Sequence, residues 1–137
     1  PPSKSEEERK RLKKQKEEEE KLLKQHRANV EKFKAKVETK LIEFIKDGTR
    51  TNYGFQPCNK MYRSIIHEVA DSLSLLSYAF GIDELNRYVH IYKREHPPSE
   101  DELIVRKRGE DWNEETRKKL LDEKQREAEL SNSNTKV

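Results

Sequence analysis

The residues best suited to chemistry are Arg63 and His67, which stand four positions apart. Four residues make slightly more than one helical turn, so in a helix the guanidinium and the imidazole lie one above the other. A guanidinium presents a forked donor to a phosphate, and an imidazole gains charge or donates a hydrogen bond when an anion approaches. Because Ile65 and Ile66 would face the core, we expect the pair to be exposed and to bind a phosphate, with support from Lys60.

A simpler interpretation of the same segment is a solvated helix face. Glu68 and Asp71 would then be the charge partners of Arg63 and His67. The spacing Arg-x-x-x-His arises often by chance, so the spacing alone favours this simpler interpretation.

Aromatic side chains that could stack on bases lie in the segment 87–93. There Val89 and Ile91 alternate with three ring-bearing residues, which are Tyr88, His90 and Tyr92. A base stacked on an aromatic ring contributes about 1–3 kcal/mol to binding. If the face that carries the rings is open, it is a stacking platform, and if helices cover it, the rings are core residues. The alternation does not decide between these two arrangements.

A cluster of basic residues lies near the N-terminus and consists of Arg9, Lys10, Arg11, Lys13, Lys14 and Lys16. Such a cluster is typical of a nuclear-import signal or of an electrostatic anchor on nucleic acid. The alternative is a solvated charged helix, because acidic runs at 6–8 and 17–20 flank the cluster. We expect a nuclear protein, with the cytoplasm as the alternative, and no secretion.

Charge divides the 137 residues into three parts. Residues 1–40 carry 14 Lys and Arg against 9 Asp and Glu, residues 41–98 carry 7 against 7, and residues 99–137 carry 9 against 11. Only 31% of the residues are hydrophobic and 42% are charged, compared with roughly 45–50% and 25% in ordinary globular chains. Only the middle part can therefore bury a core.

The composition also argues against several classes of function. No apolar run approaches the ~20 residues of a membrane-spanning helix, and a single cysteine, Cys58, excludes a disulfide framework or a zinc cluster. We find no glycine-rich phosphate loop, no pair of core carboxylates and no cluster of metal ligands. We therefore expect no enzyme activity, no cofactor, no metal and no membrane partner. The chain opens on Pro1-Pro2 and not on Met, which leaves open a longer natural protein.

Apolar spacing and turn residues predict the elements that position these side chains. Apolar residues step by three or four from Val30 to Phe44, which predicts one buried helical stripe. The stripe lasts about two heptads, so packing on its own domain is the favoured use and dimerisation is the alternative. The expected elements are helices at 5–46, 59–73, 99–107 and 114–130, an extended piece at 55–57, and hairpin strands at 75–80 and 87–93.

Residues 59–94 resemble the Arg-x-x-x-His domain, usually called the R-three-H domain. The matching pieces are Arg63 and His67 on an amphipathic helix and the two strands at 76–81 and 87–93. The resemblance to one member of this family extends from about residue 33 to residue 112, and it adds Phe55-Gln56-Pro57 and the element Gly109-Glu110-x-Trp112.

The resemblance implies a fold and a class of ligand. Members of the family fold as a three-stranded antiparallel sheet with two helices on one side, and they are associated with binding of single-stranded DNA or RNA. Arg63 and His67 would be the binding pair. Two features weigh against this function: the middle part has no net charge, although non-specific binding scales with the phosphates neutralised, and we find no helicase or nuclease module of the kind that often accompanies the domain.

We therefore expect an α+β fold in which helices pack on one face of a small three-stranded antiparallel sheet. The expected parts are a charged helical arm at 1–29, the Arg-x-x-x-His domain at 30–96, a charged helical extension at 97–130 and a disordered tail at 131–137. The expected function is non-catalytic binding of single-stranded nucleic acid by a monomer. The alternative is a protein-interaction or scaffold module with no nucleic-acid role.

Overall fold

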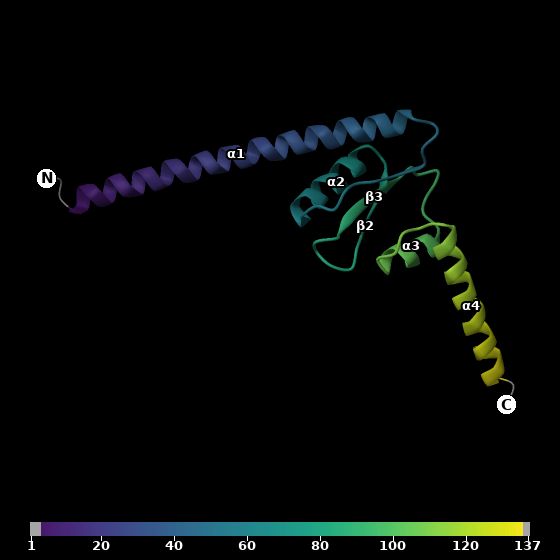
Figure 1. The fold of residues 1–137 in the computed structure, drawn as a ribbon. Coiled ribbons are helices and arrows are strands. Elements are labelled where there is room, and N and C mark those ends of the chain that lie inside the picture. The colour runs from purple at the N-terminus through teal and green to yellow at the C-terminus, as the bar shows by residue number, and fades with distance from the viewer. Residues whose placement is uncertain (1–3, 136–137) are drawn as a thin grey trace.

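The computed structural model describes residues 4–135 and has the expected α+β class. The elements follow one another along the chain as shown in Figure 1. They are α1 (Lys4–Lys46), β1 (Asn52–Gly54), α2 (Lys60–Ser72), β2 (Leu76–Phe80), β3 (Tyr88–Tyr92), α3 (Glu100–Lys107) and α4 (Glu114–Thr135).

The sheet has β3 at its centre, with β1 and β2 antiparallel on either side. β1 lies just before the extended piece expected at 55–57. Residues 55–58 still follow β3, because the amide of Phe55 donates to the carbonyl of Val89 (3.0 Å) and the amide of Cys58 donates to the carbonyl of Arg87 (3.2 Å). Pro57 has no amide hydrogen to contribute, and this segment runs alongside β3 without being part of a regular strand.

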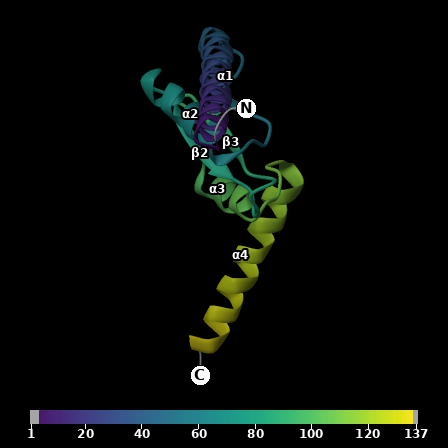
Figure 2. The same ribbon diagram turned by 90° about the vertical axis from the view of Figure 1, so that its left-hand side faces the viewer.

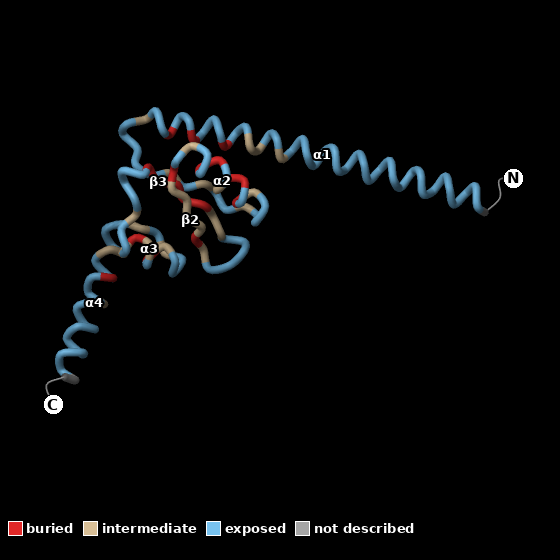
Figure 3. The backbone as a smooth tube through the Cα atoms, turned by 180° about the vertical axis from the view of Figure 1, so that it is seen from behind, coloured by how far each residue is buried: buried red, intermediate tan, exposed pale blue. Residues whose placement is uncertain are grey.

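The long helix α1 is unbroken over 43 residues. Its residues 5–29 are exposed, and Val30 is the first that is half-buried, so the expected boundary at 29/30 falls inside a continuous helix at the point where burial begins. Figure 3 shows buried positions only on the half of α1 that crosses the domain. This half packs against α2 and contributes Val37, Leu41 and Phe44 to the core.

Helices cover both faces of the sheet, although we expected them on one. On the first face, α1 and α2 enclose Val89 and Ile91, which are fully buried. Asn59 caps α2 by accepting a hydrogen bond from the amide of Tyr62 (2.9 Å), and the stripe from Ile65 to Ala70 faces this core. On the second face lies α3, whose buried residues include Val105.

The two terminal helices leave the domain in different directions, as the perpendicular views in Figures 1 and 2 show. The expectation of a disordered tail from residue 131 is corrected, because α4 continues to Thr135. Residues 136–137 lie outside the described part of the chain. None of the helices within 4–135 is long and apolar enough to cross a membrane.

Candidate nucleic-acid interface

The first turns of α2 and the facing hairpin enclose a pocket of about 270 Å³. The pocket is lined by Lys60, Arg63, Ser64, His67, Ala79 and Arg87, and we call it the basic pocket. The helical spacing accounts for three of these positions, because Lys60, Arg63 and His67 follow one another at intervals of three and four residues along α2. The hairpin adds Ala79 from β2 and Arg87 from the residue directly before β3.

Arg63 was expected to be exposed, and this expectation is wrong, because only 6% of its surface is accessible. Its Nη1 donates to the carbonyl of Cys58 (2.6 Å), and its Nη2 donates to the carboxylate of Glu84 (2.7 Å). The side chain therefore ties α2 to the preceding segment and to the β2–β3 loop. Arg63 both lines the basic pocket and holds its walls together.

His67 is half-buried and reaches across to β2. Its Nδ1 lies 2.6 Å from the hydroxyl of Ser77. Burial, and secondarily the positive charge of Arg63, lower the pKa of His67 below its ordinary value of 6.5. The lowered pKa favours the neutral imidazole at pH 7. In the tautomer in which the hydroxyl of Ser77 donates to Nδ1, the ring proton sits on Nε2. A neutral imidazole in this tautomer is a hydrogen-bond donor for an anion.

Arg87 is the residue of this site that the sequence analysis missed. Its Nε is buried and has no hydrogen-bond partner within the described residues. A buried donor of this kind costs free energy until an acceptor reaches it. The only signal in the sequence was that a basic residue begins the second hairpin strand. The alternation of apolar and ring-bearing residues along that strand assigned no function to it.

Lys60 is exposed at the edge of the basic pocket. The six basic residues of the arm, from Arg9 to Lys16, are also exposed. They lie on the half of α1 that projects away from the domain in Figure 1. The structure therefore brings Lys60, Arg63 and His67 together and leaves the arm separate from them.

Of the two arrangements left open for Tyr88, His90 and Tyr92, the structure has the covered one, because α3 lies on that face of the sheet. His90 and Tyr92 are only 7% and 2% exposed, so a base cannot lie on their rings, whereas Tyr88 is half-buried. The hydroxyl of Tyr92 donates to the carboxylate of Glu102 on α3. Arg106 donates to the same carboxylate (2.9 Å) and to the hydroxyl of Tyr88 (3.2 Å).

The ionisation of these buried rings follows from the same packing. Burial, followed by the positive charge of Arg106, lowers the pKa of His90 to about 4, so the ring is neutral. Its Nε2 lies 2.8 Å from the side-chain oxygen of Asn52. Burial and the bond to Glu102 raise the pKa of Tyr92. Tyr88 and Tyr92 therefore attach α3 to the sheet, and the buried ring of His90 is held by Asn52 of β1. Within residues 4–135 there is also no group of three or more His, Cys, Asp and Glu that could hold a metal ion.

A comparison with known protein families finds a match over the segment that contains the basic pocket. Residues 32–93 match the family model of the R-three-H domain. This segment includes the buried half of α1, all of α2 and the whole sheet. Residues 32–93 are therefore similar to the R-three-H domain, as Arg63 and His67 predicted, and domains of this kind generally bind nucleic acid.

Two relatives share more than the domain. The chain is 38% identical over 133 residues to sperm-associated antigen 7 of Mus musculus, an alignment that covers 93% of this chain and 59% of the relative. It is 44% identical over 80 residues to the sperm-associated antigen 7 homolog of Danio rerio, covering 58% of this chain and 35% of the relative. This similarity confirms the wider resemblance seen between residues 33 and 112. The chain spans less than two thirds of the length of either relative.

Proposed function

We propose that this chain binds single-stranded RNA or DNA without catalysing a reaction on it, and that the basic pocket grips one phosphate. One observation carries the proposal. Three cationic side chains and a neutral imidazole line a single pocket, and one of the cations, Arg87, has a buried N–H without an acceptor in the described residues. A phosphate oxygen is an acceptor of the right charge for that N–H, and charge-assisted hydrogen bonds of this type are strong.

Each side chain has a distinct part in this mechanism. Lys60 supplies a mobile charge at the edge, and His67 donates from Nε2. Arg63 is already bonded to the carbonyl of Cys58 and to Glu84, so its Nη2 becomes available when Glu84 moves away. Because the side chain of Glu84 is 64% exposed, that movement costs little free energy.

The basic arm would add a non-specific electrostatic attraction between the protein and the phosphates of the nucleic acid. Its charges lie far from the pocket along α1, and each one that neutralises a phosphate makes binding more dependent on salt. We also propose that the arm directs the protein to the nucleus. Expression of the chain fused to a fluorescent protein, with and without the six basic residues changed to Gln, tests this localisation.

Fluorescence anisotropy with labelled single-stranded RNA and DNA tests the function itself. The test variant is Lys60→Ala/His67→Gln, which spares the buried Arg63. The matched control is Lys118→Ala/His96→Gln, which removes the same residue types from exposed positions elsewhere. We expect the test variant to bind at least about tenfold more weakly, which corresponds to ~1.4 kcal/mol, and the control to bind like the wild type.

Other outcomes have equally definite meanings. Equal binding by both variants, with loss of binding when the arm is neutralised, would make the arm the binder and the domain a scaffold. No binding by the wild type at low salt would favour the alternative function as a protein-interaction module. In that case the exposed leucines of α1, Leu12, Leu22 and Leu23, are the first surface to examine.

A further inference from the structure

Two further hollows lie where α1 crosses the domain. The first has a volume of about 280 Å³, and its lining includes Phe33, Tyr53, Phe55, Pro57 and Cys58. We call it the aromatic pocket. Its size is just below the roughly 300–1,000 Å³ of sites for drug-sized ligands, which suits a single planar group. Phe33, Tyr53 and Phe55 are each half-buried and pack against the hydrophobic core.

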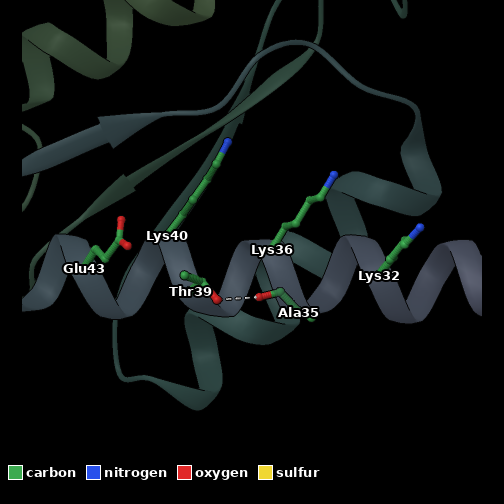
Figure 4. A pocket seen from close by; sticks show the side chains of 6 residues that line it. All are labelled: Lys32, Ala35, Lys36, Thr39, Lys40 and Glu43. Carbon is green, nitrogen blue, oxygen red and sulfur yellow. Dashed lines mark hydrogen bonds between the residues drawn. The ribbon is translucent and has the colours of Figure 1, made fainter.

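The second hollow follows α1 and has a volume of about 480 Å³. Lys32, Lys36 and Lys40 line it, and we call these three residues the lysine row. The lysines are exposed and extend from the same side of the helix, as Figure 4 shows. Successive members are about 6 Å apart along the helix axis. Like charges at this spacing destabilise a helix slightly, whereas an extended polyanion laid along the row would relieve their repulsion.

One shared residue and one hydrogen bond connect the three hollows. Lys40 lines both the lysine row's hollow and the aromatic pocket. Cys58 lines the aromatic pocket, and its carbonyl accepts a hydrogen bond from Arg63, which lines the basic pocket. The aromatic pocket therefore lies between two sets of positive charges. Glu43 is the one acidic residue that lines any of the three hollows within the described chain.

We propose that single-stranded nucleic acid crosses all three hollows, with one base in the aromatic pocket and phosphates on Lys36, Lys40 and the basic pocket. This inference rests on the proposed function and extends it from one phosphate to a path. Alternating aromatic surfaces and cations are the arrangement that binds single strands with little sequence preference. The positive charge of the lysines and the half-buried aromatic residues that line the pocket together favour this occupant over an apolar or a cationic partner.

The test uses the whole chain and a pair of labelled oligomers about ten nucleotides long, within the range that a single-strand site commonly covers. One oligomer is an all-thymine strand, and the other has the same length and charge but carries abasic residues at its centre. Phe55→Leu removes the ring and keeps an apolar side chain. Lys36→Gln/Lys40→Gln removes two exposed charges, and Lys107→Gln/Lys118→Gln is its charge-matched control on α3 and α4.

We expect the two variants to weaken binding of the oligomers in different ways. Phe55→Leu should weaken binding of the thymine strand about fivefold or more and leave binding of the abasic strand unchanged. Lys36→Gln/Lys40→Gln should weaken both strands and reduce the slope of log K against log salt by about 0.7 for each lost phosphate contact. The control pair should change neither strand.

Several results would contradict the proposed path of the strand across the three hollows. If both variants bind like the wild type while Lys60→Ala/His67→Gln binds weakly, the path is wrong and the proposed function stands. If Phe55→Leu weakens both strands equally, no base occupies the aromatic pocket. If the wild type binds neither strand but binds poly-glutamate through Lys36 and Lys40, the row serves an acidic protein, and the proposed function fails together with the path.

Discussion

The Nη2 atom of Arg63 lies 2.7 Å from the Oε1 atom of Glu84, a residue 21 positions later in the chain. The guanidinium is almost fully buried, while 64% of the carboxylate side chain is exposed. Glu84 therefore accepts, from the solvent side, a hydrogen bond from the Nη2 donor for which a bound phosphate would compete. The ion pair joins an arginine that lines the basic pocket to an exposed residue of the β2–β3 loop.

Replacement of Glu84 should strengthen binding of single-stranded nucleic acid. In Glu84→Gln the competing charge is lost, and because an exposed ion pair contributes about 0–1 kcal/mol, we expect affinity to rise up to about fivefold. Anisotropy titrations measure the change. Glu95→Gln alters the net charge equally at an exposed position away from the pocket, so an equal gain in that control would attribute the effect to net charge alone.

Arg87 should contribute more to binding than its half-buried position suggests. Arg87→Gln removes the charged donor whose Nε has no acceptor in the described residues, and hydrogen bonds to charged groups contribute about 1.5–3 kcal/mol. We expect affinity to fall by at least about tenfold. Circular dichroism and thermal melts check that the variant is folded. Arg94→Gln, at an exposed position beyond β3, is the control, and an equal loss in both variants would contradict a specific role for Arg87.

Binding should strengthen as the pH falls, through His67. In the free protein the pKa of His67 is lowered below 6.5, chiefly by burial, and an adjacent phosphate would raise it by stabilising the charged form. Binding then takes up a proton in the window between the lower free value and the higher bound value. Affinity should rise by up to about tenfold per pH unit within that window.

Anisotropy titrations from neutral to mildly acidic pH measure this dependence. His67→Gln should show a nearly flat profile, and His96→Gln, which removes an exposed histidine elsewhere, should keep the slope of the wild type. A slope that survives in His67→Gln would assign the proton uptake to another group.

Loss of the Tyr92 hydroxyl should lower the stability of the fold and leave binding unchanged. Tyr92→Phe removes one of two donors to the buried carboxylate of Glu102, while Arg106 still donates to it. A hydrogen bond to a charged group contributes about 1.5–3 kcal/mol, so we expect a loss of this order. Chemical denaturation measures the loss in free energy of unfolding. Tyr78→Phe makes the same change at a half-buried position of β2 and should cost less. A large loss of affinity in Tyr92→Phe at a temperature where it is folded would restore this face as a binding surface.

The sequence by itself determined the helices, the hairpin and the placement of Arg63 beside His67. Helical spacing placed Arg63 and His67 on one side of α2, because that relationship depends only on the geometry of a single helix. The apolar stripe from Val30 to Phe44 identified the half of α1 that is buried, because only an apolar face gains from being removed from water. These features are local, and neighbouring residues are enough to specify them.

Only the tertiary structure decided which surfaces are accessible. Alternation along β3 separates Val89 and Ile91 from Tyr88, His90 and Tyr92, but it cannot say that α3 covers the second face. The burial of Arg63 depends on Glu84 and Cys58, and the part played by Arg87 depends on the hairpin that brings it opposite α2. Contacts between distant segments form where the folded chain gains most free energy as a whole, and no local pattern contains that information.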